Sequence, residues 1–314
     1  RAEPYRAALA EGAALEVRDE SGKTALIRVA YSPDGAEVIR FLAGQGANVE
    51  AVDELGNSAV SVAATFHSGP ELMAAVLSAA SEPEQRRRLL TVALSRAVEA
   101  RKLENLEWLV TACAQTDPNL PREATLLLRA TEFDWEAGAG LLIKAGVDVN
   151  TSDTGGTTPL IQACQSASAG LVQLIIDAGA DVDHHDDTGL TALMYASRRG
   201  ELGCMRALLG AGAGVDTRSG NGCTALMFAT HQGGSEAIKA LLEAGANVDA
   251  QDEYGLTALM YACHPPYGYW PPHQISPLLA AGTDLEMRDN LGRTALMHAY
   301  IHRIHMRGAV EQLI

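Results

Sequence analysis

The sequence predicts an all-α solenoid, in which short helical units stack one on the next along the chain. A motif that starts with Thr or Ser, continues through apolar residues and ends on Ala recurs through the 314 residues. Its starting positions are separated mostly by 33 or 34 residues, a period typical of repeat architectures. A Gly stands 12 residues before most of them, and two signals in fixed phase make chance an unsatisfactory explanation. The starting residues are Thr24, Ser58, Thr91, Thr125, Thr158, Thr191, Thr224, Thr257 and Thr294.

The sequence of each repeating unit of about 33 residues predicts two helices. The run 191–197 is short, apolar and rich in Ala, which suits a helix packed closely between neighbours. The hydroxyl of Thr191 can cap its start by accepting from free backbone N–H groups. Gly200 then interrupts the pattern, and 202–209 reads as a second, amphipathic helix. Gly212 follows where a left-handed helix stop is expected.

The segments between units predict tight turns. Residues 183–189, 216–222 and 249–255 contain the Asp and Gly that hairpin-like turns use for side-chain hydrogen bonds and positive φ. The complete unit is therefore a turn, a helix, a turn, a helix and a loop.

This unit, D-x-x-G-x-T-A-L-x-x-A followed by a Gly break, Leu-Leu and Ala-Gly-Ala, resembles the ankyrin repeat. The resemblance covers essentially the whole chain as about nine units. It implies an ankyrin-repeat solenoid of stacked helix-turn-helix units with β-hairpin-like finger turns. The sequence departs from the common form by Ala where Pro often follows the Thr, and by Met where His often stands three residues after it. Met is an adaptable apolar side chain, so we expect the inner helices to lose one polar bond and gain packing.

Breaks in the pattern divide the chain into three predicted segments, 1–80, 81–130 and 131–314. The middle segment keeps helices but lacks the finger turn, because Leu89 and Glu123 stand where Gly is expected two residues before the Thr. This degenerate centre is either a change in curvature or ordinary repeat drift.

A proline-rich loop interrupts the last segment at 263–273. Its four Pro cannot continue a helix, so it is expected to project from the repeats. Tyr267, Tyr269 and Trp270 lie within it, and exposed rigid aromatic side chains are good interface anchors. The alternative is that these rings fold back over the neighbouring turns as a local cap.

The sequence offers little for catalysis, and neither a cofactor nor a metal is expected. The cluster from His184 to Asp187 contains possible metal ligands, but the turn already requires Asp186 for hydrogen bonding. Cys164 and Cys263 occupy equivalent positions where small residues otherwise stand, which predicts packing roles. The five Cys form no CxxC pair and are too few and too spread for a disulfide scaffold, which favours a reducing, cytoplasmic location.

The charge and hydropathy of the chain limit the classes of partner that it can bind. A net charge of -15 repels nucleic acid and anionic membrane surfaces. No apolar run approaches the ~20 residues that a transmembrane helix needs. Residues 131–260 contain 17 acidic and 6 basic side chains, so we expect a protein partner with a basic segment.

The resemblance also implies where a partner binds. In proteins with this repeat, ligands most often contact the concave groove through residues four, three and one before the Thr and seven and eight after it. The expected centre is Tyr254, Leu256, His231 and Arg199, because such side chains are good anchors. The candidate residues are Glu54, Phe66, Asp187, Leu190, Arg198, Arg199, Asn221, His231, Gln232, Glu253, Tyr254 and Leu256.

Three functions follow, in order of preference. The first is a non-enzymatic scaffold that binds a partner protein through this groove. The second is a targeting or regulatory arm of a larger enzyme or effector, because the sequence begins and ends inside a unit. The third, an enzyme within these residues, depends only on the cluster at His184 and on isolated Cys.

Overall fold

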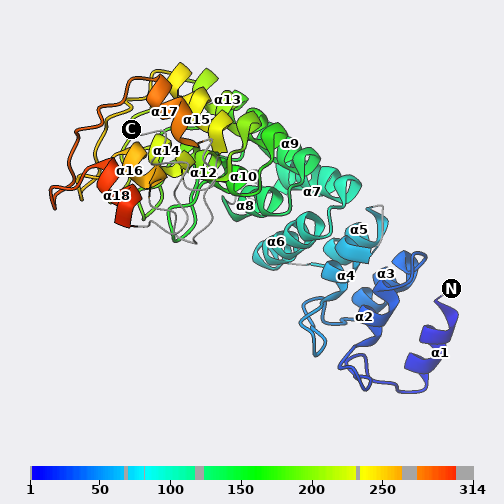
Figure 1. The fold of residues 1–314 in the computed structure, drawn as a ribbon. Coiled ribbons are helices and arrows are strands. Elements are labelled where there is room, and N and C mark those ends of the chain that lie inside the picture. The colour runs from blue at the N-terminus through cyan, green and yellow to red at the C-terminus, as the bar shows by residue number, and fades with distance from the viewer. Residues whose placement is uncertain are drawn as a thin grey trace. The chain divides into compact units, whose positions relative to one another are not determined.

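The chain is a succession of short helices. The computed structural model describes residues 2–66, 70–80, 82–116, 124–230, 234–263 and 274–301. Within them the regular structure consists of eighteen helices, which follow one another in stacked pairs (Figure 1). Only two isolated β-bridges occur in these residues, Val52 with Ser58 and His185 with Thr191, both in turns before inner helices. The predicted all-α repeat architecture is confirmed, and none of the described helices is both long and apolar enough to cross a membrane.

The chain divides into two compact units, residues 1–148 and 149–314, called unit 1 and unit 2. In unit 1 successive helical pairs pack on each other, with α2 and α3 against α4 and α5, and α6 and α7 against α8 and α9. Its helices are α1 (Glu3–Ala10), α2 (Ala25–Ala30), α3 (Ala36–Gly44), α4 (Ala59–Phe66), α5 (Glu71–Leu77), α6 (Pro83–Glu99), α7 (Leu103–Thr116), α8 (Ala124–Glu132) and α9 (Glu136–Lys144).

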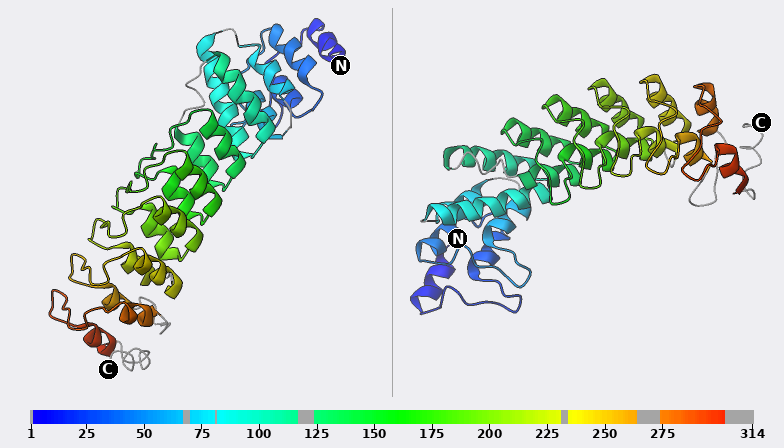
Figure 2. Two further views of the ribbon diagram at one scale, coloured as in Figure 1. Left: turned by 90° about the horizontal axis from the view of Figure 1, so that it is seen from above. Right: turned by 90° about the vertical axis from the view of Figure 1, so that its left-hand side faces the viewer.

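Unit 2 consists of two rows of helices. The inner helices α10, α12, α14, α16 and α18 contact each other in sequence, and so do the outer helices α11, α13, α15 and α17. The long loops between successive helical pairs project from one side of this stack (Figure 2). The helices are α10 (Pro159–Gln165), α11 (Ala169–Asp177), α12 (Ala192–Arg199), α13 (Leu202–Gly210), α14 (Ala225–Phe228), α15 (Gly234–Glu243), α16 (Ala258–Ala262), α17 (Ile275–Ala280) and α18 (Ala295–Ile301).

The core of unit 2 comes from the apolar positions of the repeated motif. In α12, Leu193 and Met194 are each 1% exposed, and Ala196 is fully buried. The small Ala allows neighbouring inner helices to approach closely, while Leu and Met fill the space between the rows. Met227 and Met260 are buried at the same position of their helices, which supports the expected packing role of this Met, whereas Met297 in α18 is 46% exposed.

The predicted ends of α12 are confirmed, and most inner helices of unit 2 begin in the same way, although the Thr224 hydroxyl at the start of α14 has no hydrogen-bond partner among the described residues. The Met194 backbone N donates to the Thr191 hydroxyl at 3.4 Å, and Thr158 and Thr257 cap their helices in the same way. Gly200 ends α12 in the left-handed region with φ 72°, as the break in the sequence pattern predicts.

The centre of unit 1 is built differently. Five residues separate α5 from α6, whereas fourteen separate α11 from α12, so a finger has no room between α5 and α6. Instead α6 extends over 17 residues. The compact units meet at 148, not at 80 or 130, and the three-segment division of the chain stays a proposal. Residues 264–273 of the predicted proline-rich loop lie outside the residues that the structure describes.

Candidate functional site

Three fingers of unit 2 are organised around a buried Asp, at 186, 252 and 289. In the finger 186–190, the Asp186 Oδ1 atom accepts from the backbone N of Thr188 at 2.9 Å and of Leu190 at 3.0 Å. Gly189 supplies the positive φ of 77° that the turn needs. Burial alone would raise the pKa of Asp186, but hydrogen bonds from Thr188, Tyr195 and Leu190 lower it below its usual range. The fingers with an equivalent Asp accepting from the same two backbone positions start at Asp19, Asp53, Asp153, Asp252 and Asp289.

The second carboxylate oxygen ties the finger to its inner helix. The Tyr195 hydroxyl donates to Asp186 Oδ2 at 2.7 Å, and Tyr261 donates to Asp252 Oδ2 at the same distance. His298 Nε2 lies 2.9 Å from the Oδ2 atom of Asp289. Each partner stands nine residues after its Asp. A finger is thereby fixed to the helix that follows it, and its exposed side chains are held in place.

Backbone hydrogen bonds join each finger to the next. In each bond a backbone N of one finger donates to a backbone O of the finger before it. The bonds are Asp187 N to Gly155 O at 3.0 Å, Gly220 N to Thr188 O at 3.3 Å, Glu253 N to Asn221 O at 3.1 Å and Asn290 N to Tyr254 O at 2.9 Å. We call the five connected fingers, 153–157, 186–190, 219–223, 252–256 and 289–293, the finger row. The row forms a continuous edge of unit 2 that holds its side chains at a regular spacing.

A second set of acidic side chains joins the bases of the fingers. Asp183 Oδ1 accepts from Gly214 N at 2.7 Å, and Asp216 Oδ1 accepts from Asn247 N at 2.9 Å. Asp249 Oδ1 accepts from the Asp284 N at 3.0 Å. Many carboxylates of the acidic segment therefore bond to backbone within unit 2.

One finger departs from the pattern, and a pocket lies beside it. The finger 219–223 begins with Ser219 instead of Asp, and its inner helix carries Phe228 where the adjacent helices carry Tyr195 and Tyr261. The pocket has a volume of about 260 Å³. Its lining consists of Thr188, Leu190, Ser219, Asn221, Cys223, Met227, Phe228 and Tyr261.

The residues that line the floor of this pocket are uncharged while the Cys223 thiol is protonated, and the Asp252 carboxylate lies directly behind them. The Cys223 Sγ atom lies 3.4 Å from the Tyr261 hydroxyl oxygen and 3.9 Å from Asp252 Oδ2. Burial raises the pKa of the Cys223 thiol, and it also raises the pKa of the Tyr261 phenol, with added contributions from Cys223 and Asp252. The thiol thus remains protonated at neutral pH, which disfavours a nucleophilic role because the thiolate is the reactive form.

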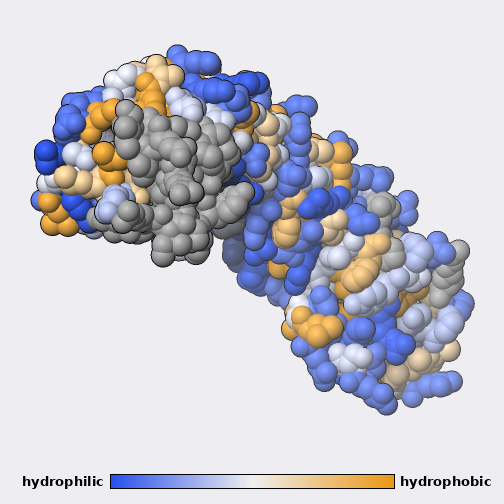
Figure 3. All heavy atoms as spheres, viewed as in Figure 1, coloured by the Kyte–Doolittle hydropathy of each residue, from blue (hydrophilic) through white to orange (hydrophobic). Residues whose placement is uncertain are grey.

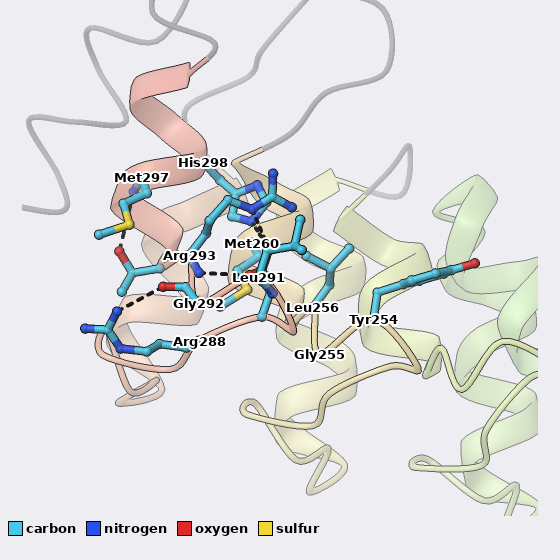
Figure 4. A network of polar contacts seen from close by, with 12 residues as sticks. Tyr254, Gly255, Leu256, Met260, Arg288, Leu291, Gly292, Arg293, Met297 and His298 are labelled. Atoms are coloured by element: carbon cyan, nitrogen blue, oxygen red, sulfur yellow. Dashed lines mark hydrogen bonds and ion pairs between the residues drawn. The ribbon is translucent and has the colours of Figure 1, made fainter.

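The predicted residues of unit 2 fall at two places. Asp187, Glu253 and Tyr254 are exposed on the finger row, with 62% of Tyr254 accessible. Figure 4 shows the Tyr254 ring extending away from the other labelled side chains. The arginines lie instead at the end of α12, where the Arg198 guanidinium stacks over Tyr195 at 5.3 Å and Arg199 is exposed. Leu190, Asn221 and Leu256 complete the predicted set on the finger row, and the first two line the pocket.

The other predicted residues do not join this site. Glu54 and Phe66 belong to unit 1, where the Phe66 ring centroid lies 5.2 Å from that of Tyr31. The remaining five lie outside the described residues, namely His231, Gln232, Tyr267, Tyr269 and Trp270.

The cluster from His184 to Asp187 is engaged in the turn. His184 Nε2 lies 3.1 Å from the Gly156 carbonyl oxygen, and His185 Nδ1 lies 3.2 Å from that of Asp186. The Asp186 carboxylate accepts from Thr188, Leu190 and Tyr195. These contacts assign the cluster to the architecture of the finger.

Six lining residues of the pocket were not among the predicted site residues, although the sequence contains a signal for two of them. Ser219 is the one exception among the seven finger-starting residues that are otherwise Asp, and Phe228 stands nine residues later. Met227 and Tyr261 lie on inner helices and were predicted only as core.

Hydrophobic residues on the face drawn in Figure 3 form small patches separated by hydrophilic surface. The large apolar side chains exposed on fingers are Leu55 in unit 1 and Tyr254 and Leu291 in unit 2. The apolar side chains exposed on the fingers are therefore few and lie at separate positions in the sequence.

Comparison with protein families matches ankyrin repeats (three copies) at residues 94–186, 129–219, 166–252 and 193–269. These overlapping matches span more than half of the chain. No enzyme family is among the matches. Comparison with curated proteins finds no significant match.

Proposed function

The chain belongs to the ankyrin repeat family, whose repeats generally serve as protein-protein interaction modules, and on that premise we propose a non-enzymatic scaffold. Unit 2 binds a partner protein through the finger row and the adjoining side chains of the inner helices. The observation that carries this proposal is the chain of backbone hydrogen bonds between fingers, from Gly155 to Asn290. A surface held in this way loses little conformational entropy when a partner binds.

The partner segment is basic where it meets the fingertips. Asp187 and Glu253 are exposed there, whereas Asp186 and Asp252 are buried and accept hydrogen bonds inside the unit. Opposite charges at the rim favour association and orient the partner. Arg199 at the end of α12 adds a positive group on the inner-helix side.

A cytoplasmic location fits the cysteines. None of the five forms a disulfide, and Cys113, Cys164, Cys204 and Cys263 are buried. Burial raises the pKa of the Cys263 thiol to about 12. These thiols act as small packing groups, as proposed from the sequence for Cys164 and Cys263.

The test identifies a partner by its place of contact. A photo-crosslinking amino acid is introduced at Tyr254 in the finger row and, separately, at Lys239 on the outer helix α15. We expect a partner that crosslinks from position 254 and not from position 239. The affinity of this purified partner is then measured for Tyr254→Ala combined with Arg199→Ala, with Lys239→Ala as the control.

The double variant should bind at least about tenfold more weakly, since aromatic and Arg anchors commonly contribute about 1 kcal/mol or more each. Its circular dichroism should match that of the parent chain, because Tyr254 and Arg199 are both exposed. Equal affinity of the parent and the double variant would count against binding through the groove that the finger row and the inner helices form.

A further inference from the structure

We propose that the pocket beside α14 is the anchor subsite of this partner site. It receives one apolar side chain, aliphatic or aromatic, from an extended segment of the partner that has Lys or Arg next to that anchor. The inference rests on the proposed function, because it names the chemistry that the partner presents.

The pocket exists because one finger lacks the bond that its neighbours have. In the two adjacent fingers, Asp186 with Tyr195 and Asp252 with Tyr261 occupy the space between finger and inner helix. Ser219 is shorter than Asp, and Phe228 has no hydroxyl, so the corresponding space is open. The site is thus local to one repeat, and it breaks an otherwise regular surface.

The size of the pocket indicates the kind of guest. Pockets that bind small molecules usually measure about 300–1,000 Å³. With about 260 Å³, this pocket is below that range, and five of its eight lining residues belong to the finger row. A single side chain of a bound segment fits these dimensions better than a cofactor does.

The lining determines the polarity of the guest. Leu190, Met227 and Phe228 provide apolar walls, and none of the lining residues carries a formal charge while the Cys223 thiol is protonated. A charged guest would lose its hydration here, and the Asp252 carboxylate behind the floor already accepts from Tyr261, Tyr254 and Leu256. An apolar side chain gains from burial, at roughly 25 cal/mol per Å² of surface removed from water.

The surroundings of the pocket determine the residue next to the anchor. Asp187 precedes the lining residue Thr188, and Glu253 donates its backbone N to the carbonyl of the lining residue Asn221. Both carboxylate side chains are exposed. They place negative charge on the two fingers that flank 219–223, so a Lys or Arg beside the anchor is complementary.

The structure suggests a variant that closes the pocket while keeping the fold. Ser219→Asp combined with Phe228→Tyr reproduces the pair that two neighbouring repeats already contain. The Cys223 N atom, which donates to the Ser219 hydroxyl at 3.1 Å, can donate to the new carboxylate. Cys223→Leu is a second variant, which fills the floor without adding charge. Circular dichroism and thermal unfolding verify that both remain folded.

The probe is a library of random peptides displayed on phage and selected against the full chain. We expect the selected peptides to share an apolar residue next to Lys or Arg. A synthetic peptide of this kind should bind the Ser219→Asp/Phe228→Tyr variant at least about tenfold more weakly than the parent, measured by fluorescence anisotropy. At alkaline pH, where part of the Cys223 thiol is ionised, the peptide should also slow the alkylation of Cys223 by N-ethylmaleimide, as measured by mass spectrometry. Lys239→Ala is the matched control and should bind as the parent does.

The outcomes separate the two proposals. If closing the pocket leaves the affinity unchanged while Tyr254→Ala with Arg199→Ala lowers it, the anchor subsite is refuted and the groove stands. If neither pair of substitutions changes the affinity, or no peptide binds, both proposals are refuted. Selected peptides with acidic residues beside the anchor would overturn the chemistry stated here.

Discussion

At the scale of single residues, the buried finger carboxylates link the stability of the fold to pH. Asp289 accepts from the backbone N of Leu291 at 2.9 Å and of Arg293 at 2.8 Å, and its Oδ2 atom contacts Arg293 Nε at 2.8 Å. His298 Nε2 completes the set at 2.9 Å (Figure 4). Burial alone would raise the pKa of Asp289, but these hydrogen bonds lower it to about 2 from an ordinary value of 3.8.

Asp289→Asn should therefore destabilise unit 2 at neutral pH and less so in acid. A carboxyl whose pKa is lower in the folded chain stabilises the fold above its unfolded pKa, and this contribution is lost as the pH falls from 3.8 toward 2. We expect a loss of roughly 1–2 kcal/mol at neutral pH. Urea unfolding at neutral and acidic pH measures it, with Glu286→Gln as the control. An equal loss at both pH values would contradict the assignment.

At the scale of the finger, local conformation was predictable and the contacts between elements were not. Thr191 and Gly200 mark the ends of α12 because helix caps depend on residues adjacent in sequence. The bond from Tyr195 to Asp186 joins two elements, and no helix or turn propensity encodes it. The pocket depends on two substitutions nine residues apart, and their effect became evident only when the intact Asp–Tyr pairs could be seen beside Ser219 and Phe228.

Two glycines with similar backbone conformations test how closely the fingers pack. Gly189 and Gly212 have φ of 77° and 88°, so alanine is strained at both. A Cβ atom at 189 would lie 2.3 Å from the Gly220 backbone N, whereas one at 212 would meet no atom within 4 Å. Gly189→Ala should lower the free energy of unfolding by more than Gly212→Ala, by about 1–3 kcal/mol beyond the ~1 kcal/mol expected of the strain alone. Urea denaturation measures both, and equal losses would show that the fingers can separate without cost.

The base of the finger gives a second prediction at this scale. Asp183→Ala removes the acceptor for Gly214 N, which lies 2.7 Å from it, and should destabilise unit 2 by about 1 kcal/mol. Asp187→Ala is the matched control, because its exposed side chain can be removed while its backbone bond to Gly155 persists. Thermal unfolding compares the two variants. Equal effects of the two substitutions, which change the net charge by the same amount, would show that net charge, rather than the hydrogen bond, controls stability.

At the scale of the whole molecule, the two compact units predict how far a local defect spreads. In a stack of repeats each unit contacts only its neighbours, so stability is approximately a sum of local and nearest-neighbour contributions. Gly189→Ala strains the junction of the fingers 186–190 and 219–223, both inside unit 2. The lost stabilisation should concentrate in the repeats adjoining that junction and decrease along the chain.

Hydrogen exchange read by mass spectrometry can follow this spread. In Gly189→Ala, we expect faster exchange in peptides from α10 to α15 than in the parent chain. Peptides from α1 to α5 should keep their parental rates, because these helices lie in the other compact unit. Gly22→Ala provides the reciprocal case, since a Cβ at this position would lie 2.9 Å from the Glu54 side chain within unit 1. If either substitution accelerated exchange equally in both units, the 314 residues would unfold as one cooperative body, and the additive description of the stack would be wrong.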